Sequence, residues 1–87
     1  MKRIAFLTEA FEDFTNWAIT DRKIYGKITS LIRDIQRDPF AGIGKPEPLR
    51  HELGGLWSRR ITDEHRLVYK VTEQEIVIIS CRYHYAK

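Results

Sequence analysis

The feature that most constrains this sequence is a change of hydrophobic pattern near residue 39. Before that point apolar residues recur every three or four positions, which is the spacing of an amphipathic helix, and after residue 55 the chain holds β-rich runs. Between the two, residues 39–48 contain all three prolines and two of the five glycines. The sequence therefore predicts a helical first half, a stiff loop and a strand-rich second half.

The first half predicts a short strand over residues 2–7 and then two helices. Thr8 offers a hydroxyl to cap the first helix, and Asp21 is a capping candidate for the second, which Pro39 ends. We expect Trp17 and the phenylalanines at helical spacing to lie in the core. Gly26, inside the second helix, costs up to about 1 kcal/mol relative to alanine, so we interpret it as a close-packing position.

The second half predicts a meander of antiparallel strands over residues 56–61, 66–71 and 76–83. The two helices form an antiparallel pair whose apolar face needs a sheet to cover it. We therefore predict an α+β fold with two N-terminal helices packed on a small, mainly antiparallel twisted sheet. With 87 residues the chain is one domain, residues 1–87.

Composition excludes several classes of protein. The net charge of +3 favours anionic partners only weakly. The longest apolar run, 76–79, is far shorter than the roughly 18 residues of a membrane span. A single cysteine, Cys81, fits a reducing compartment such as the cytoplasm, and we expect it to be an inert buried thiol. His51 and His65 lack partners at metal-ligand spacing, so we leave both structural and predict no metal and no cofactor.

The candidate functional site centres on Glu47. Pro46 and Pro48 restrict the backbone on either side of it and so limit where its carboxylate can point. Basic residues lie in or beside the same loop and sheet: Lys45, Arg50, Arg59, Arg60, Arg66, Arg82 and His84. Aromatic residues are interleaved with them: Trp57, Tyr69, Tyr83 and Tyr85. This mixture suits a phosphodiester with stackable bases, because arginine grips phosphate and rings accept base faces.

Strand register gives this hypothesis a geometric test. Arg60 and Arg66 share a sheet face only if their hairpin closes with an odd number of loop residues, such as 62–64. For His84 to join them, the second connection must also be odd-numbered, or His84 must lie beyond the regular ladder. On such a face Glu47 could accept a proton from an RNA 2'-hydroxyl, Arg66 could stabilise the pentacoordinate phosphorus, and His84 could protonate the departing 5'-oxygen.

Each of these residues also has a plainer interpretation. An isolated Pro-Glu-Pro is usually a rigid surface turn, and adjacent arginines such as Arg59 and Arg60 are more often solvated or in contact with a partner. A histidine such as His84 usually has a surface or packing role.

The chain resembles a known family over nearly its whole length. The segments that carry the resemblance are Gly44-Lys45-Pro46-Glu47-Pro48-Leu49, Trp57-Ser58-Arg59-Arg60-Ile61, Glu64-His65-Arg66-Leu67-Val68-Tyr69 and Cys81-Arg82-Tyr83-His84-Tyr85. They are similar to the YoeB/Txe toxins of the RelE/ParE superfamily. The resemblance implies a bacterial type II toxin that cuts messenger RNA in the ribosomal A site, is neutralised by a YefM-type antitoxin and is cytoplasmic; the family also suggests dimerisation.

Carried over by motif, the resemblance makes Glu47 the general base, His84 the general acid and Arg66 the stabiliser of the phosphorane. Arg50, Arg60 and Tyr85 would position phosphate and base. Arg50 departs from the lysine expected at that place, and residues 86–87 extend past the usual aromatic end. Two other functions stay open: a ParE-like toxin that holds gyrase, and a non-catalytic module that binds RNA or the ribosome.

Overall fold

The computed structural model of this protein describes residues 1–50 and 55–83. Within those ranges the chain forms two helices and one five-stranded sheet. The elements in chain order are β1 (Arg3–Phe6), α1 (Thr8–Thr20), α2 (Arg22–Arg37), β2 (Glu47–Pro48), β3 (Leu56–Arg60), β4 (Arg66–Val71) and β5 (Glu75–Ser80). The α+β architecture predicted from the sequence is confirmed, and both helices precede the meander.

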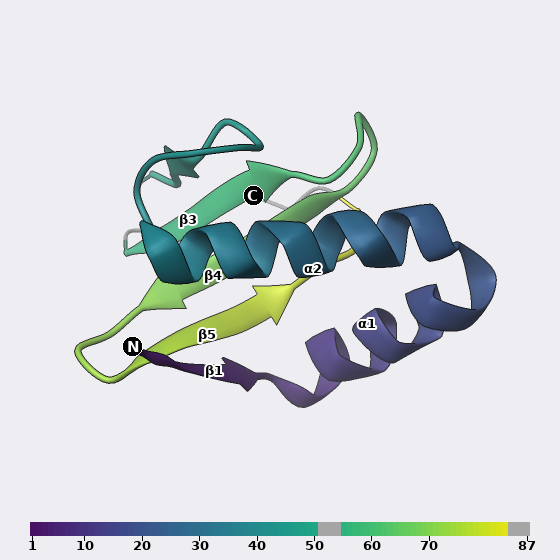
Figure 1. Ribbon diagram of the computed structural model, residues 1–87, viewed down its shortest axis with the longest axis horizontal. Coiled ribbons are helices and arrows are strands. Elements are labelled where there is room, and N and C mark those ends of the chain that lie inside the picture. The colour runs from purple at the N-terminus through teal and green to yellow at the C-terminus, as the bar shows by residue number, and fades with distance from the viewer. Residues whose placement is uncertain (51–54, 84–87) are drawn as a thin grey trace.

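The strands lie in the order β1-β5-β4-β3-β2. The predicted antiparallel meander of β3, β4 and β5 is confirmed, and β2 extends it as a short antiparallel edge strand. β1 pairs in parallel with β5, so the first strand of the chain is bound to the last (Figure 1). Within the β4–β5 pair the register shifts between Val68 and Tyr69, which gives β5 one extra residue there.

The two helix starts differ from each other. The start of α2 is as predicted, because the Asp21 carboxylate caps the helix by accepting hydrogen bonds from the Lys23 and Ile24 amides at 3.1 and 3.2 Å. The prediction that Thr8 caps the first helix is wrong. The cap position is Leu7, whose amide still pairs with Ile78 of β5, so the strand passes directly into the helix without a side-chain cap.

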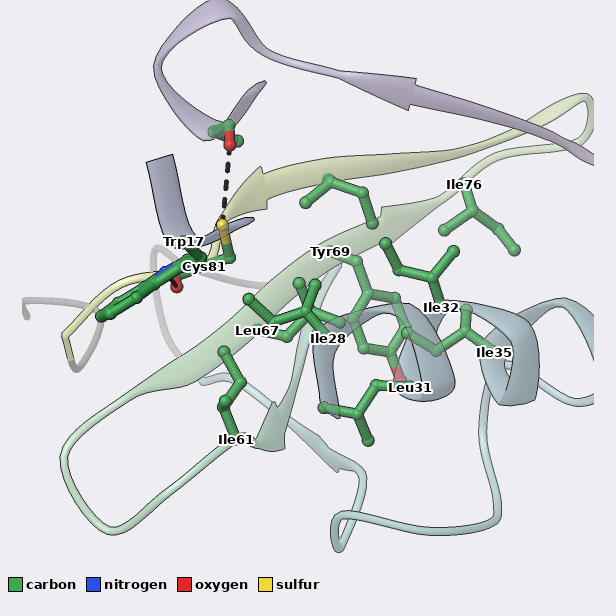
Figure 2. Packing of buried hydrophobic residues seen from close by; sticks show 12 residues of the cluster. Trp17, Ile28, Leu31, Ile32, Ile35, Ile61, Leu67, Tyr69, Ile76 and Cys81 are labelled. Carbon is green, nitrogen blue, oxygen red and sulfur yellow. Dashed lines mark hydrogen bonds between the residues drawn. The ribbon is translucent and has the colours of Figure 1, made fainter. Parts of the chain in front are cut away.

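The core lies between α2 and one face of the sheet. Ile28, Leu31, Ile32 and Ile35 occupy one side of α2, and they pack against sheet residues that include Leu67, Tyr69, Ile76 and Ile78. In Figure 1 α2 crosses the sheet on this face, with α1 running beside it. Figure 2 shows Trp17 of α1 and Cys81 at one end of this cluster, with Ile35 and Ile76 at the other.

Two packing predictions for the helices are corrected. Gly26 lies two residues from Ile24 and Ile28 of the buried stripe, so it is on the opposite side of the helix, and a Cβ built there would meet nothing within 4 Å. It is not a close-packing position. Phe11 is half exposed, whereas Phe14 is partly buried against the rings of Phe6 and Tyr25.

Among the described residues, neither helix is long and apolar enough to cross a membrane.

Candidate active site

Strand alternation separates two adjacent arginines onto opposite faces of the sheet. Arg59 points toward α2 and the core, so Arg60 points to the face opposite the helices, because successive side chains of a strand alternate. Arg66 lies directly across from Arg60 in the β3–β4 pair and therefore shares that face. The two arginines that the sequence assigned to one surface are together on it.

The hairpin that joins β3 and β4 has the predicted odd-numbered loop. The Ile61 amide donates to the His65 carbonyl at 3.0 Å, which closes the hairpin around residues 62–64. The connection between β4 and β5 behaves differently, because Val71 pairs with Ile76 and leaves four residues, 72–75, between the pair. The regular β5 ladder ends at Ser80, and His84 lies outside the described residues.

The loop before the sheet brings Glu47 to the same face. Glu47 pairs with Ser58, which is two residues from Arg60 and therefore on its side of β3. The Arg60 amide donates to the Gly44 carbonyl at 2.7 Å, and the Leu49 amide donates to Leu56 at 2.8 Å. Backbone bonds thus hold the chain to β3 on both sides of Glu47, whose side chain is exposed.

Gly44 is the residue that lets this loop lie close to the core. Its φ of +80° lies in the left-handed region, and a Cβ there would be 2.7 Å from the Leu31 Cδ2 atom and 3.2 Å from the Arg60 carbonyl oxygen. The next residue, Lys45, is also left-handed with a φ of +52°, and its side chain is exposed. A glycine is therefore required here by space as well as by backbone conformation.

Glu47 and Arg66 lie on the same face of the sheet, two strands apart. In β-sheets, neighbouring strands lie about 4.8 Å apart, and residues i and i+2 of one strand lie about 7 Å apart. The Cα atoms of Glu47 and Arg66 are offset by two strands and by one such two-residue step, so they are separated by about 12 Å. The Arg66 guanidinium is fixed by its Nη1 atom, which donates to the carbonyls of Thr62, Asp63 and His65 at 2.7, 3.1 and 3.1 Å. The face therefore presents a carboxylate and two guanidiniums, an arrangement that can bind a phosphodiester and exchange a proton with it.

The prediction that Arg59 binds phosphate is corrected by the structure. Its side chain is fully buried, and Nη1 donates to the Asp34 carboxylate at 2.6 Å and to the Ile43 carbonyl at 3.0 Å. Nη2 donates to the carbonyls of Asp38 and Ala41, and Nε donates to the Tyr69 hydroxyl. All of its donors are used inside the protein, so Arg59 fastens residues 38–43 to the sheet.

Two pKa values reflect this cluster around Arg59. The hydrogen bond from Arg59, helped by the Ile43 amide and Arg37, lowers the pKa of the Asp34 carboxyl from 3.8 to about 2. Burial raises the pKa of the Tyr69 hydroxyl, which donates to the Pro39 carbonyl at 2.7 Å. The role of Asp34 as the partner of Arg59 was not predicted from the sequence. The available signal was its position beside Ile35, at the edge of the apolar stripe of α2.

The chain after β5 is held by α1 and by the β3–β4 hairpin. Trp17 Nε1 donates to the Cys81 carbonyl at 3.0 Å, and the Arg82 guanidinium lies over the Trp17 ring and 3.8 Å from the Asp13 carboxylate. The Arg66 amide donates to the Tyr83 carbonyl at 3.1 Å. Tyr83, the residue before His84, is thereby fixed beside Arg66.

The remaining predicted residues have varied positions. Arg50 is exposed just after β2, and Arg82 is partly occupied by its contacts with α1, so their assignment to RNA stays a prediction. His84, Tyr85 and His51 lie outside the described residues. Cys81 is buried, as predicted, and burial raises the pKa of its thiol to about 12.

Two hollows of the described surface lie away from this face. One of about 360 Å³ is lined by residues from the N-terminus, the end of α2 and the β4–β5 turn, and one of about 260 Å³ lies between β1 and the helices. In residues 1–50 and 55–83, no three His, Cys, Asp or Glu side chains are grouped to hold a metal ion.

Comparison with known proteins gives consistent matches. Residues 6–85 match the model of a family described as the YoeB-like toxin of bacterial type II toxin-antitoxin system. The chain is 57% identical over 83 residues to the toxin YoeB of Streptomyces coelicolor. The aligned region covers 95% of this chain and 99% of that toxin.

Solved structures agree with the sequence matches. The YoeB dimer from Staphylococcus aureus superposes with a TM-score of 0.90 at 47% identity, covering 97% of this chain and 98% of that one. The YoeB-YefM complex from the same species superposes with a TM-score of 0.88 at 45% identity, covering 98% and 99%.

Proposed function

Since the chain belongs to the family of YoeB-like toxins of bacterial type II toxin-antitoxin systems, we propose that it is an endoribonuclease that cuts messenger RNA in the ribosomal A site. One observation carries the proposal: Glu47, Arg60 and Arg66 share the sheet face opposite the helices, and Tyr83 is hydrogen-bonded to Arg66. Ribosome dependence rests on the family resemblance.

The proposed reaction uses the chain's own side chains. Glu47 accepts the proton of an RNA 2'-hydroxyl, whose oxygen attacks the adjacent phosphorus. Arg66 stabilises the negative charge that develops on the phosphorane, and a guanidinium suits this because it can donate two parallel hydrogen bonds. His84 protonates the departing 5'-oxygen. The products are a 2',3'-cyclic phosphate and a 5'-hydroxyl, and no water is consumed in this step.

Binding is assigned to the cations around these three groups. Arg60 is exposed directly across from Arg66, and Lys45 and Arg50 flank Glu47 on the loop. These positions favour contacts with the phosphates on either side of the cut. Arg82 and Tyr85 complete the set that we propose contacts RNA, and Arg59 is removed from it because its donors are used internally.

The proposed partners follow the relatives. A YoeB toxin of Staphylococcus aureus forms a complex with YefM and was also solved as a dimer. We propose that this chain likewise binds a YefM-type antitoxin and forms a homodimer. The proposed substrate places the protein in the bacterial cytoplasm, where messages are translated.

The test is cleavage mapping by primer extension in a translating extract. Wild type is compared with Glu47→Gln, which keeps the shape of the side chain but removes the proton acceptor, and we expect the cleavage rate to fall by about 10² to 10⁴. Glu73→Gln is the matched control, because Glu73 is an exposed carboxylate in the β4–β5 turn, away from the proposed site. This control is expected to cleave like wild type.

Other outcomes separate the competing functions. Products with 5'-phosphate ends would require an activated water and would refute attack by the 2'-hydroxyl. Growth arrest that survives in Glu47→Gln would instead support a gyrase-holding toxin. Ribosome binding without new message ends would support a non-catalytic module.

A further inference from the structure

His65 holds the backbone of Tyr83 in the described structure. The Tyr83 amide donates to His65 Nδ1 at 2.8 Å, and the Tyr83 carbonyl accepts from the Arg66 amide at 3.1 Å. Both backbone groups of Tyr83 are therefore bound by two consecutive residues at the start of β4. Tyr83 has a φ of +60°, a left-handed conformation that residues with a Cβ rarely adopt. Such a backbone persists when its surroundings hold it firmly.

The bond assigns the tautomer of the neutral imidazole. Nδ1 accepts a hydrogen bond and so carries no proton, which leaves the proton of the neutral ring on Nε2. Nε2 lies 3.7 Å from a carboxylate oxygen of Glu64, whose side chain is mostly exposed. If the ring gains a second proton, Nδ1 becomes a donor that faces the Tyr83 donor, and the bond is lost.

Aromatic rings and charged groups surround His65 from every element packed against it. The Trp17 ring of α1 meets the His65 ring edge-on with the centroids 4.9 Å apart, and the Tyr83 ring, in the segment after β5, has its centroid 5.5 Å away. The Arg82 guanidinium lies over both of those rings and is paired with Asp13 of α1. The His65 ring is buried between them, so its position is set by packing before any ligand arrives.

We propose that His65 is a positioning residue for RNA cleavage: its unprotonated Nδ1 holds the Tyr83 backbone, whose carbonyl binds the amide of Arg66, and thereby supports Arg66. This inference rests on the proposed function, in which Arg66 stabilises the phosphorane. His65 itself does not touch the reacting atoms in this scheme. The α1 helix takes part through Trp17, whose ring contacts the His65 ring and whose Nε1 donates to the carbonyl of Cys81, two residues before Tyr83.

The first test needs no variant. In the full-length protein labelled with ¹⁵N, the Tyr83 N–H···Nδ1 bond is expected to give a scalar coupling between the two nitrogens, and the Nδ1 shift is expected to be that of an unprotonated nitrogen. Absence of the coupling, or a proton on Nδ1 at neutral pH, would overturn the proposal whether or not the protein cleaves RNA.

The second test uses two variants of His65. His65→Asn keeps an acceptor near the Nδ1 position, whereas His65→Phe keeps a ring and removes the acceptor. We expect hydrogen exchange at the Tyr83 amide to be about tenfold faster in the phenylalanine variant and near wild type in the asparagine variant. Unfolding curves for both proteins show whether each is folded under the assay conditions.

The third measurement links the bond to turnover. In the cleavage assay we expect kcat of the phenylalanine variant to fall at least about tenfold with KM unchanged, because Arg66 is proposed to act on the transition state and its loss of support affects the chemical step and not binding. The asparagine variant is expected to recover most of this loss. Equal losses in the two variants, or wild-type kcat in both, would overturn the positioning role. If wild type itself cleaves nothing, the proposed function fails, and the claim about Tyr83 is decided by the exchange rates alone.

Discussion

Two adjacent arginines should respond in opposite ways to the same substitution. Arg59→Gln removes a fully buried side chain that makes five hydrogen bonds, one of them to the Asp34 carboxylate. At a net value of about 1 kcal/mol per bond, with some recovered by glutamine and by water, we expect a loss of about 3 to 5 kcal/mol. Arg60→Gln changes an exposed side chain and should alter stability by less than about 0.5 kcal/mol.

This loss is large for a chain of 87 residues. Such domains have unfolding free energies of about 4 to 13 kcal/mol in total, and each kcal/mol moves the melting temperature by about 4 to 8 °C. The Arg59 variant is therefore expected to melt at least about 12 °C below wild type. Urea titration and thermal melting followed by circular dichroism measure both variants under identical conditions.

The cleavage assay provides the second half of the comparison. Arg60→Gln should fold like wild type and cleave more slowly, because it removes a cation directly across from Arg66. Arg59→Gln should bind RNA as wild type does wherever it remains folded. A stable Arg59 variant with reduced affinity for RNA would refute the internal role assigned to this guanidinium.

Three further predictions concern other parts of the chain. Gly26→Ala should raise the unfolding free energy by up to about 1 kcal/mol in urea titration, because its Cβ meets nothing within 4 Å and alanine favours helix; a loss of stability would contradict the open position. The pKa of Asp34 is lowered from 3.8 to about 2 in the folded protein, so the stability it contributes is complete above about pH 4 and is lost as the pH falls toward 2. Urea midpoints should show this loss in wild type and a smaller one in Asp34→Asn. The thiol of Cys81, whose pKa burial raises to about 12, should react with a disulfide reagent at pH 8 only as fast as the protein unfolds, and rapid labelling of the native protein would oppose this.

Local patterns were sufficient to predict most of the fold. The apolar stripe of α2, its Asp21 cap and the three β-rich runs each depend on residues near one another in sequence, and all are present. The parallel pairing of β1 with β5 was not predicted, because it joins residues about seventy positions apart and nothing in either strand specifies the partner. The prediction that Gly26 is a close-packing position failed for a related reason. Helix propensity gives the free-energy cost of a glycine but does not say which side of the helix is exposed to solvent.

The site was predictable where register decides it. An odd-numbered hairpin was enough to put Arg60 opposite Arg66, and that relation is present. The same alternation sends Arg59 to the other face, yet a buried guanidinium needs a specific set of acceptors, and these come from α2 and from residues 38–43. Only the folded chain brings the Asp34 carboxylate and those carbonyls together around Arg59. From residue type alone, the arginine was therefore predicted to bind phosphate.

The pairing of β1 with β5 also bears on how this protein is made. Synthesis delivers β1 first, but its neighbour in the sheet, residues 75–80, emerges only after every other element. A growing polypeptide can form its helices and its β3–β4 hairpin early, while the position between β1 and β4 stays vacant until β5 has been synthesised. For a member of a toxin family, this delays assembly of the sheet until residues 75–80 have left the ribosome.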